Sequence, residues 1–402
     1  MEPTLTWIDL TASDRDKMRR VLDLFTEKGT LDEMGLGSLR DALSDTLFPG
    51  TSYIQTRLRY VLFIPWIYQR LEIRRVSGSS VEQAGRKAEI DLIGSLRRDD
   101  PDADGIIGVL ARGSLQRLPS SLYWTALRRW GIFRHDQSQS WYHTHYSTLS
   151  QSRDGIDHAD DPGVVWTREP NWHQRLPKPP DAFPGEASFS LTREEADFLQ
   201  GRLEERCAGT LLGWLARNGS DVLAADFWDD VDAMRAPGNI PNTVELARRF
   251  SLHVEGMPLL YNLLVAERCR DADVKDTRDS IEEYRAKITA WAAAEAKETQ
   301  YEPEALWELV VRSGRRLPTP QRLFVENWSR RLPELDPDVV AGDVHLRRLI
   351  IDRERQLKSE RARLANRNRL LDWRPGTGVG RMDFRWVRVR QFMIDLHRGL
   401  AS

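Results

Sequence analysis

Arginines near the end of the chain are the residues whose type and spacing best suit a chemical task. Residues 343–398 hold fifteen lysines or arginines against seven aspartates or glutamates, although the whole chain has a formal net charge of -2. A guanidinium binds phosphate through two parallel hydrogen bonds and stacks on flat rings. Trp373, Phe384 and Trp386 lie between these arginines, where aromatic rings would suit the stacking of unpaired bases. The pattern predicts contact with DNA or RNA.

A second pair of arginines lies at the polar start of the apolar segment 51–68, after a turn at Pro49–Gly50. A helix that began there would favour an anion at its N-terminus. The alternative for all these arginines is that they form ion pairs with the acidic remainder of the chain or with an acidic partner. The residues predicted to bind nucleic acid are Arg57, Arg59, Arg361, Arg363, Arg367, Arg369, Arg381, Arg385, Arg388 and Trp386.

Metal and cofactor signatures are weak in this sequence. His143 and His145 are two residues apart, so on a helix they point to different faces and have no acidic or thiol ligand at a metal spacing. The glycines of RPGTGVGR at 374–381 lack the lysine and hydroxyl of a phosphate-binding loop. We therefore expect neither a metal nor a cofactor, and no motif identifies a catalytic residue.

The elements that must position these side chains are mainly helices. Ser79 with Glu82 and Thr192 with Glu195 have the spacing of capping boxes, and Thr319 before a proline predicts another helix start. Alternating runs of β-branched residues are nearly absent, which leaves room for at most a small hairpin. Ser13 is expected to cap a helix through Leu24. Apolar stripes with helical spacing are formed by Leu199, Leu203, Cys207 and Leu211, by Phe250, Val254, Met257, Tyr261 and Leu264, and by Ile281, Tyr284, Ile288 and Trp291.

Two segments carry more specific helix signals. In the first, Thr51 or Ser52 is expected to cap a buried helix that carries Tyr60, Phe63, Ile64 and Ile67 on one face and ends or kinks at Pro65. In the second, residues 118–133 have a serine cap, an apolar helix and a tight exit at Gly131. That pattern is typical of half a helix-turn-helix or winged-helix-like unit, with Arg128 and Arg129 near a groove, and also of any helical hairpin.

The chain length and the proline distribution predict several domains. Six prolines and several aromatic residues lie between positions 151 and 190, so this segment is expected to pack across a domain without forming regular helix. The expected organisation is an N-terminal helical domain at 1–150, a connecting strap at 151–190, a second helical domain at 191–340 and a basic C-terminal module at 341–402.

The cysteines, the apolar runs and the N-terminal sequence indicate where in the cell the protein is expected. The two cysteines, Cys207 and Cys269, have no pairing motif, no run of about 18 apolar residues occurs, and the N-terminus lacks a basic start followed by an apolar core. These features predict a cytoplasmic protein that is not embedded in a membrane.

Several blocks of the sequence resemble a bacterial family catalogued only as a domain of unknown function. They are LFPGTSYIQTRLRYVLFIPWIY at 47–68, LPSSLYWTALRRWGI at 118–132, FSLTREEADFL at 189–199, GMPLLYNLLVAE at 256–267, and ERARLANRNRL with GRMDFRWVRVR near the C-terminus. The resemblance implies a setting in mobile or defence-related gene neighbourhoods, with a helicase-like or other defence-system protein as partner. It implies no activity and no catalytic residue.

Three functions stay open on the sequence. The first is a nucleic-acid-associated, non-catalytic component of a bacterial, anti-phage defence system. The second is a helical protein-binding scaffold whose basic module docks an acidic partner. The third is a metal-dependent nuclease whose carboxylates and lysine come together only in the fold.

Overall fold

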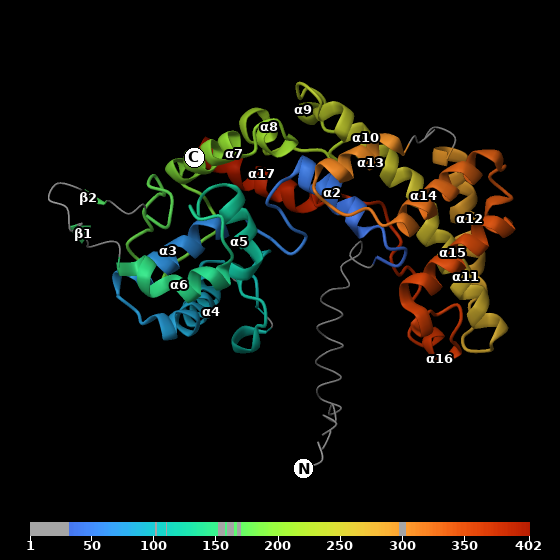
Figure 1. Ribbon diagram of the computed structural model, residues 1–402, viewed down its shortest axis with the longest axis horizontal. Coiled ribbons are helices and arrows are strands. Elements are labelled where there is room, and N and C mark those ends of the chain that lie inside the picture. The colour runs from blue at the N-terminus through green and yellow to red at the C-terminus, as the bar shows by residue number, and fades with distance from the viewer. Residues whose placement is uncertain are drawn as a thin grey trace, which may run out of the picture. The chain divides into compact units, whose positions relative to one another are not determined.

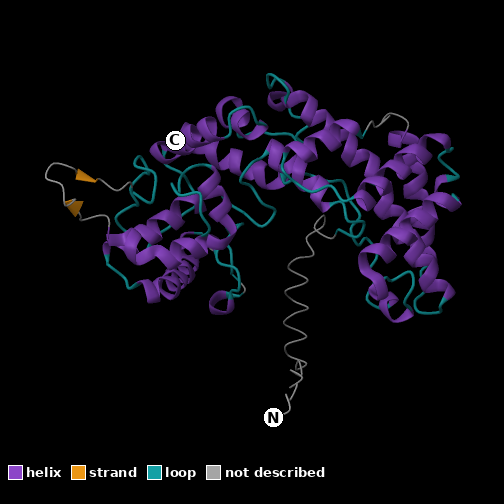
Figure 2. Cartoon of the chain, viewed as in Figure 1, coloured by secondary structure: helices purple, strands orange, loops and turns teal. Residues whose placement is uncertain are grey.

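The computed structural model describes residues 32–100, 103–109, 111–151, 157–158, 165–166, 170–296 and 303–402. The helix expected from Ser13 to Leu24 lies outside these residues. The described part is mainly helical, as the sequence predicted, with one two-stranded antiparallel hairpin (Figure 2).

The chain divides into two compact units. The first unit joins the residues up to Leu43 to Leu246–Phe384, and the second joins Ser44–Glu245 to Arg385–Ser402. Residues 341–402, expected to form one C-terminal module, are thus shared between the two units. Figure 1 labels the helices and strands of both units.

The elements before and within the strap are α2 (Gly37–Leu47), α3 (Tyr60–Ile73), α4 (Val81–Asp99), α5 (Pro119–Arg129), α6 (Gln139–Gln151), β1 (Asp157–His158) and β2 (Val165–Trp166). The later helices are α7 (Arg193–Arg206), α8 (Leu211–Asn218), α9 (Val231–Met234), α10 (Ile240–Val254), α11 (Gly256–Asp271), α12 (Arg278–Trp291), α13 (Glu304–Arg312), α14 (Thr319–Arg331), α15 (Val344–Lys358), α16 (Arg367–Leu370) and α17 (Trp386–Ala401).

The local signals for helix starts give mixed results. Thr192 and Glu195 form the predicted capping box at the start of α7. The box predicted from Ser79 and Glu82 is wrong, because Ser80 precedes α4 and makes no side-chain cap. Thr319 is the first residue of α14 and does not cap it. The apolar stripe predicted from Phe250 to Leu264 is buried, but it belongs to two helices, α10 and α11, that meet at Glu255.

Helix α3 is the centre of the second unit. Its residues Tyr60–Tyr68 are all buried, and Pro65 lies inside the helix without ending it. The cap predicted at Thr51 or Ser52 is wrong, because α3 begins only at Tyr60. Residues 51–59 are instead a loop, in which the Tyr123 hydroxyl accepts from the backbone nitrogens of Thr56 at 2.7 Å and Arg57 at 3.0 Å. A distant hydroxyl therefore satisfies backbone groups that a helix would have paired.

The described strap residues from 170 onwards pack against α3, which agrees with the predicted packing across a domain. Phe183 and Phe63 stack with ring centroids 5.7 Å apart, and the Trp66 indole donates to the carbonyl of Pro177 at 2.7 Å. Trp172 is also buried. Aromatic burial of this kind supplies enough apolar contact to order a segment that lacks helical hydrogen bonds. Among the residues described, no helix is long and apolar enough to cross a membrane.

The helix-turn-helix interpretation of residues 118–133 is not confirmed. Helix α5 ends at Arg129 and α6 begins only at Gln139, which exceeds the turn of about four residues that the motif uses. The exit at Gly131 is as predicted, with a φ of +68° and the Ile132 nitrogen donating to the Leu127 carbonyl. No serine side chain caps α5.

A buried carboxylate from α4 takes the place of the missing cap. Glu89 accepts from the Ser120 nitrogen and from the Ser120 hydroxyl, both at 2.7 Å, at the first turn of α5. Burial raises the pKa of Glu89 to about 7, although the Ser120 donors oppose the shift. A carboxyl of α4 thus holds the start of α5 in place.

This arrangement predicts a pH dependence of stability. A pKa raised in the folded state means that folding retains a proton, so the contribution of Glu89 is full below about pH 4.5 and is lost as the pH rises through about 7. We expect the melting temperature to fall between pH 5 and pH 8, and this fall to be smaller in Glu89→Gln. The exposed Glu82→Gln on the same helix is the control. An unchanged pH profile in Glu89→Gln would contradict the assignment.

Candidate nucleic-acid interface

The two arginines of the signature segment are paired inside the second unit. Arg57 donates to both carboxylate oxygens of Asp395, with an Nη2–Oδ1 distance of 2.8 Å, and its guanidinium lies over the ring of Phe189. Arg59 is buried and donates to Glu195 at 2.6 Å. Both follow the alternative that the sequence left open, in which the arginines pair with acidic residues of the same chain.

The residues predicted at the start of α17 are also engaged. Arg385 donates to Asp45 at 2.7 Å and to the Thr51 carbonyl at 2.9 Å. Arg388 donates to the Tyr53 carbonyl at 3.0 Å. Trp386 is 1% exposed and donates its indole proton to the carbonyl of Ala224. Its ring therefore has no open face for a base. Trp373 and Phe384 are also buried, so their rings cannot stack on a base either.

The remaining predicted arginines belong to the first unit. Arg363 donates to Glu33 and to the Tyr261 hydroxyl, both at 2.9 Å, and Arg381 pairs with Glu255 at 3.1 Å. Three others have exposed side chains: Arg361 has no ion pair within the described residues, Arg367 donates to the Ala272 carbonyl, and Arg369 lies 3.5 Å from Asp372. These three and Arg381, which is also exposed, are the members of the original set whose side chains remain accessible to phosphate.

A different set of basic residues gathers around the turn that follows α5. The Arg206 side chain lies beside Gly131, and Arg202 donates to the Trp130 carbonyl at 3.2 Å. His173 donates its backbone nitrogen to the Ile132 carbonyl. We call this surface the turn patch. It consists of Arg128, Arg129, Arg134, His173, Arg175, Arg202 and Arg206, contributed by α5, the turn after it, the strap and α7.

Some arginines of the turn patch form ion pairs and others form none with the described residues. Arg128 pairs with Asp136 at 3.2 Å and Arg202 with Glu205 at 2.8 Å. In contrast, the side chains of Arg129, Arg175 and Arg206 are exposed and make no ion pair with any described residue.

The electrostatic effect of the turn patch is visible at His173. Its pKa is lowered, first by burial and then by the positive charge of Arg202, Arg134 and Arg175. Burial raises the pKa of Cys207 to about 12, although Arg129 and Arg206 oppose that shift. Clustered positive charge of this kind favours an anionic partner.

Helix α6 adds an uncharged polar surface next to this patch. The helix has no Lys, Arg, Asp or Glu, and Ser140, Thr144 and His145 are exposed on it. The half-buried Trp141 stacks on His145 with ring centroids 4.5 Å apart and also contacts His135, which follows Arg134 of the turn patch. Hydroxyls and aromatic rings beside arginines are the groups that contact nucleotides in single strands.

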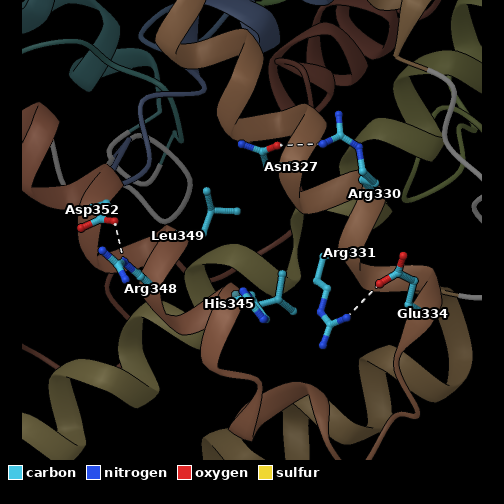
Figure 3. A pocket seen from close by; sticks show the side chains of 9 residues that line it. Asn327, Arg330, Arg331, Glu334, His345, Arg348, Leu349 and Asp352 are labelled. Carbon is cyan, nitrogen blue, oxygen red and sulfur yellow. Dashed lines mark hydrogen bonds and ion pairs between the residues drawn. The ribbon is translucent and has the colours of Figure 1, made fainter.

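The first unit has a mixed-charge hollow of about 430 Å³ between α14 and α15. Figure 3 shows that its arginines have local partners: Arg330 with Asn327, Arg331 with Glu334 and Arg348 with Asp352. The Arg348 side chain is 82% exposed. We call this the α14–α15 hollow. Its guanidiniums are less free than those of the turn patch, because carboxylates and an amide already contact them.

Catalytic constellations are not evident in the described part of the chain. No group of three or more His, Cys, Asp or Glu side chains is placed there to hold a metal ion. The Nε2 of His143 lies 2.9 Å from the Tyr68 hydroxyl, and His145 is near the Trp141 carbonyl. Asp230, in the acidic run at 226–232, caps α9.

Sequence reasoning identified only part of the turn patch. Arg128 and Arg129 were singled out as residues near a groove, but Arg175 and Arg206 were not. The usable signal was the spacing of Arg202 and Arg206, which places both on one face of α7. No local signal brings Arg175 to the same surface, because it lies in the strap.

Fold and surface together define a helical protein with arginine-lined surfaces. The chain belongs to the Family of unknown function (DUF6361), whose model matches residues 3–398. This confirms the family of uncharacterised proteins expected from the sequence blocks. No curated protein and no solved structure matches the chain.

Proposed function

We propose that this protein is a non-catalytic component that binds nucleic acid through the turn patch. The observation that supports the proposal is the set of exposed arginines that form no ion pair within the described residues: Arg129, Arg175 and Arg206. Phosphate contacts dominate the affinity of proteins for nucleic acids, and guanidiniums that pair with no carboxylate can make them without first breaking an ion pair. A bacterial, anti-phage defence system is the setting that the family resemblance suggests.

The test removes these charges and measures the salt dependence of binding. Each phosphate contact contributes about 0.9 to the slope of log K against log salt concentration for duplex DNA. For the triple variant Arg129→Ala, Arg175→Ala and Arg206→Ala we therefore expect a weaker affinity and a slope reduced by about 3. Fluorescence anisotropy with labelled single-stranded and duplex DNA and RNA, over a salt series, measures both quantities.

The matched control removes the same charge from elsewhere in the second unit. Arg193, Arg235 and Arg398 are exposed and each pairs with a surface aspartate. Their triple alanine variant should keep the wild-type slope. A second variant, Arg361→Ala, Arg367→Ala and Arg369→Ala, tests the accessible arginines predicted from the sequence. If the control and the turn-patch variant lose affinity equally, the assignment of the interface to the turn patch fails.

An acidic protein partner is the second candidate, and the α14–α15 hollow favours it. His345 and Arg348 line this hollow, and Val344, the first residue of α15, is 74% exposed beside them. An apolar side chain among basic groups suits an acidic segment with an apolar anchor. Binding of a labelled polyglutamate peptide that is weakened by Arg330→Ala with Arg348→Ala, in a protein that binds no oligonucleotide, would favour this candidate.

A further inference from the structure

A second hollow, of about 510 Å³, lies in the second unit and contains none of the turn-patch residues. Its volume is within the range of about 300–1,000 Å³ that small-molecule pockets occupy. Helices α7 and α8 form one side and the loop before α10 forms the other. We call it the Trp214 pocket. It is lined by Glu204, Ala208, Gly209, Thr210, Gly213, Trp214, Arg217, Asn218, Pro237, Gly238, Asn239 and Ile240.

Trp214 provides a fixed aromatic surface in this pocket. The indole nitrogen donates to the Asp232 carbonyl at 2.7 Å, which holds the ring in one orientation. The residue is only half-buried, so part of the indole remains accessible. A ring held by a hydrogen bond loses little conformational freedom when a flat ligand stacks on it.

Two glycines border the open space of the pocket. Gly209 has a φ of +73° and Gly238 a φ of +68°, and a Cβ on either residue would meet nothing within 4 Å. Side chains are therefore missing where the cavity is open. A flat ring can approach such backbone closely.

The polar groups of the pocket are suited to a base and a phosphate. Asn218 donates to the Trp214 carbonyl at 3.1 Å, which leaves its amide oxygen as an acceptor. Asn239 accepts from Asn242 at 3.0 Å, which leaves its amide nitrogen as a donor. A free acceptor and a free donor match the edge of a nucleobase, which carries both hydrogen-bond donors and acceptors.

Arg217 supplies the positive charge. Its side chain is 71% exposed, and it pairs with the Glu204 carboxylate at 3.7 Å, which is longer than a hydrogen bond. The guanidinium can therefore turn to a phosphate without losing a strong interaction.

We propose that the Trp214 pocket binds a nucleotide unit, with the base stacked on Trp214 and the phosphate at Arg217. The unit is either a free mononucleotide or an unpaired nucleotide within a strand, since both present the same base and phosphate. The proposal does not depend on the turn patch, so either can fail alone.

The test uses 2-aminopurine, whose fluorescence is quenched when the base stacks. The probes are 2-aminopurine riboside 5′-monophosphate, the riboside without phosphate, and an oligonucleotide with one unpaired 2-aminopurine. We expect quenching by the wild-type protein, at least tenfold weaker binding in Trp214→Ala, and at least tenfold weaker binding of the riboside than of the monophosphate. Quenching of the free monophosphate identifies a mononucleotide site, whereas quenching in the oligonucleotide alone identifies an unpaired nucleotide.

Two further variants keep the test decisive. Ala208→Phe fills the pocket from an exposed position and leaves Trp214 in place, so it should also weaken binding if Trp214→Ala fails to fold. Val222→Ala removes an exposed apolar side chain of the same unit outside the pocket and should bind as the wild type does. The proposal is overturned if the wild type quenches neither phosphorylated probe, if the riboside binds as well as the monophosphate, or if Val222→Ala loses as much binding as the pocket variants. Loss of oligonucleotide binding in the turn-patch variant, with monophosphate quenching retained, would leave it standing.

Discussion

Replacing Glu354 with alanine is expected to destabilise the first unit by about 3–5 kcal/mol, the usual cost of removing one member of a buried charged network. Glu354 is fully buried on α15. One carboxylate oxygen accepts from the Tyr261 hydroxyl at 2.7 Å, from Lys358 at 3.1 Å and from the Arg363 nitrogen at 3.0 Å. The other accepts from the Leu364 nitrogen at 3.0 Å.

The network around Glu354 also fixes a segment from the other end of the chain. Glu33 accepts from both Lys358 and Arg363. Burial alone would raise the pKa of Glu33, but these two bases outweigh burial and hold the pKa below its usual range. Without Glu354, the Tyr261 hydroxyl and two backbone nitrogens lose their acceptor, and the positive charges of Lys358 and Arg363 have one carboxylate left to share.

Hydrogen exchange measures the stability of each unit separately and so tests this prediction. In Glu354→Ala the amides of α11 and α15 should lose protection, whereas those of α3 should keep it. Glu360→Ala, on an exposed position shortly after α15, is the matched control and should leave all three helices unchanged. Equal protection of α11 and α15 in the wild type and in Glu354→Ala would show that the network is not stabilising.

Asp395→Asn is expected to have the second large effect, a destabilisation of the second unit by about 3–5 kcal/mol. The carboxylate of Asp395 is almost fully buried and accepts from Arg57, from the Leu58 nitrogen at 3.0 Å and from Gln391 at 2.9 Å. An amide of the same shape has no charge and presents a donor to the guanidinium. The loop that leads into α3 then loses its main anchor, and the melting temperature should fall.

A surface pair of the same type provides the control. Asp221 lies 3.5 Å from Arg398, and both side chains are largely exposed, so Asp221→Asn should cost less than about 1 kcal/mol. The comparison also tests the role predicted for Arg57 from the sequence. If Arg57 served a nucleic-acid phosphate and not Asp395, Asp395→Asn would retain the wild-type melting temperature.

The sequence was sufficient wherever neighbouring residues decide the structure. The capping box at Thr192 involves groups three residues apart, and the buried stripe of Ile281, Tyr284, Ile288 and Trp291 follows from the helical repeat. Apolar stripes with helical spacing and the near absence of alternating β-branched runs likewise predicted a mainly helical fold, and the sequence blocks identified the family. These features depend on interactions that recur within one or two turns of helix.

Capping signals were less reliable because several residues can satisfy the same backbone groups. The serine cap expected for α5, from Ser120 or Ser121, does not form, and Glu89 accepts from the Ser120 nitrogen from α4, 31 residues away. The start of α3 shows the same effect, since Tyr123 binds the backbone of Thr56 and Arg57 and shifts the helix start to Tyr60. Such contacts form only when the chain has folded.

The tertiary structure alone decided which arginines remain available to a ligand. A guanidinium binds carboxylate and phosphate with the same forked geometry, so residue type cannot separate a structural arginine from a binding one. Arg57 meets Asp395 across 338 positions of the sequence, while Arg129, Arg175 and Arg206 come to one surface and form no ion pair with the described residues. The sequence by itself determined the helices, the family and the surplus of arginines. Only the fold determined which of them are neutralised, because that depends on contacts between distant segments.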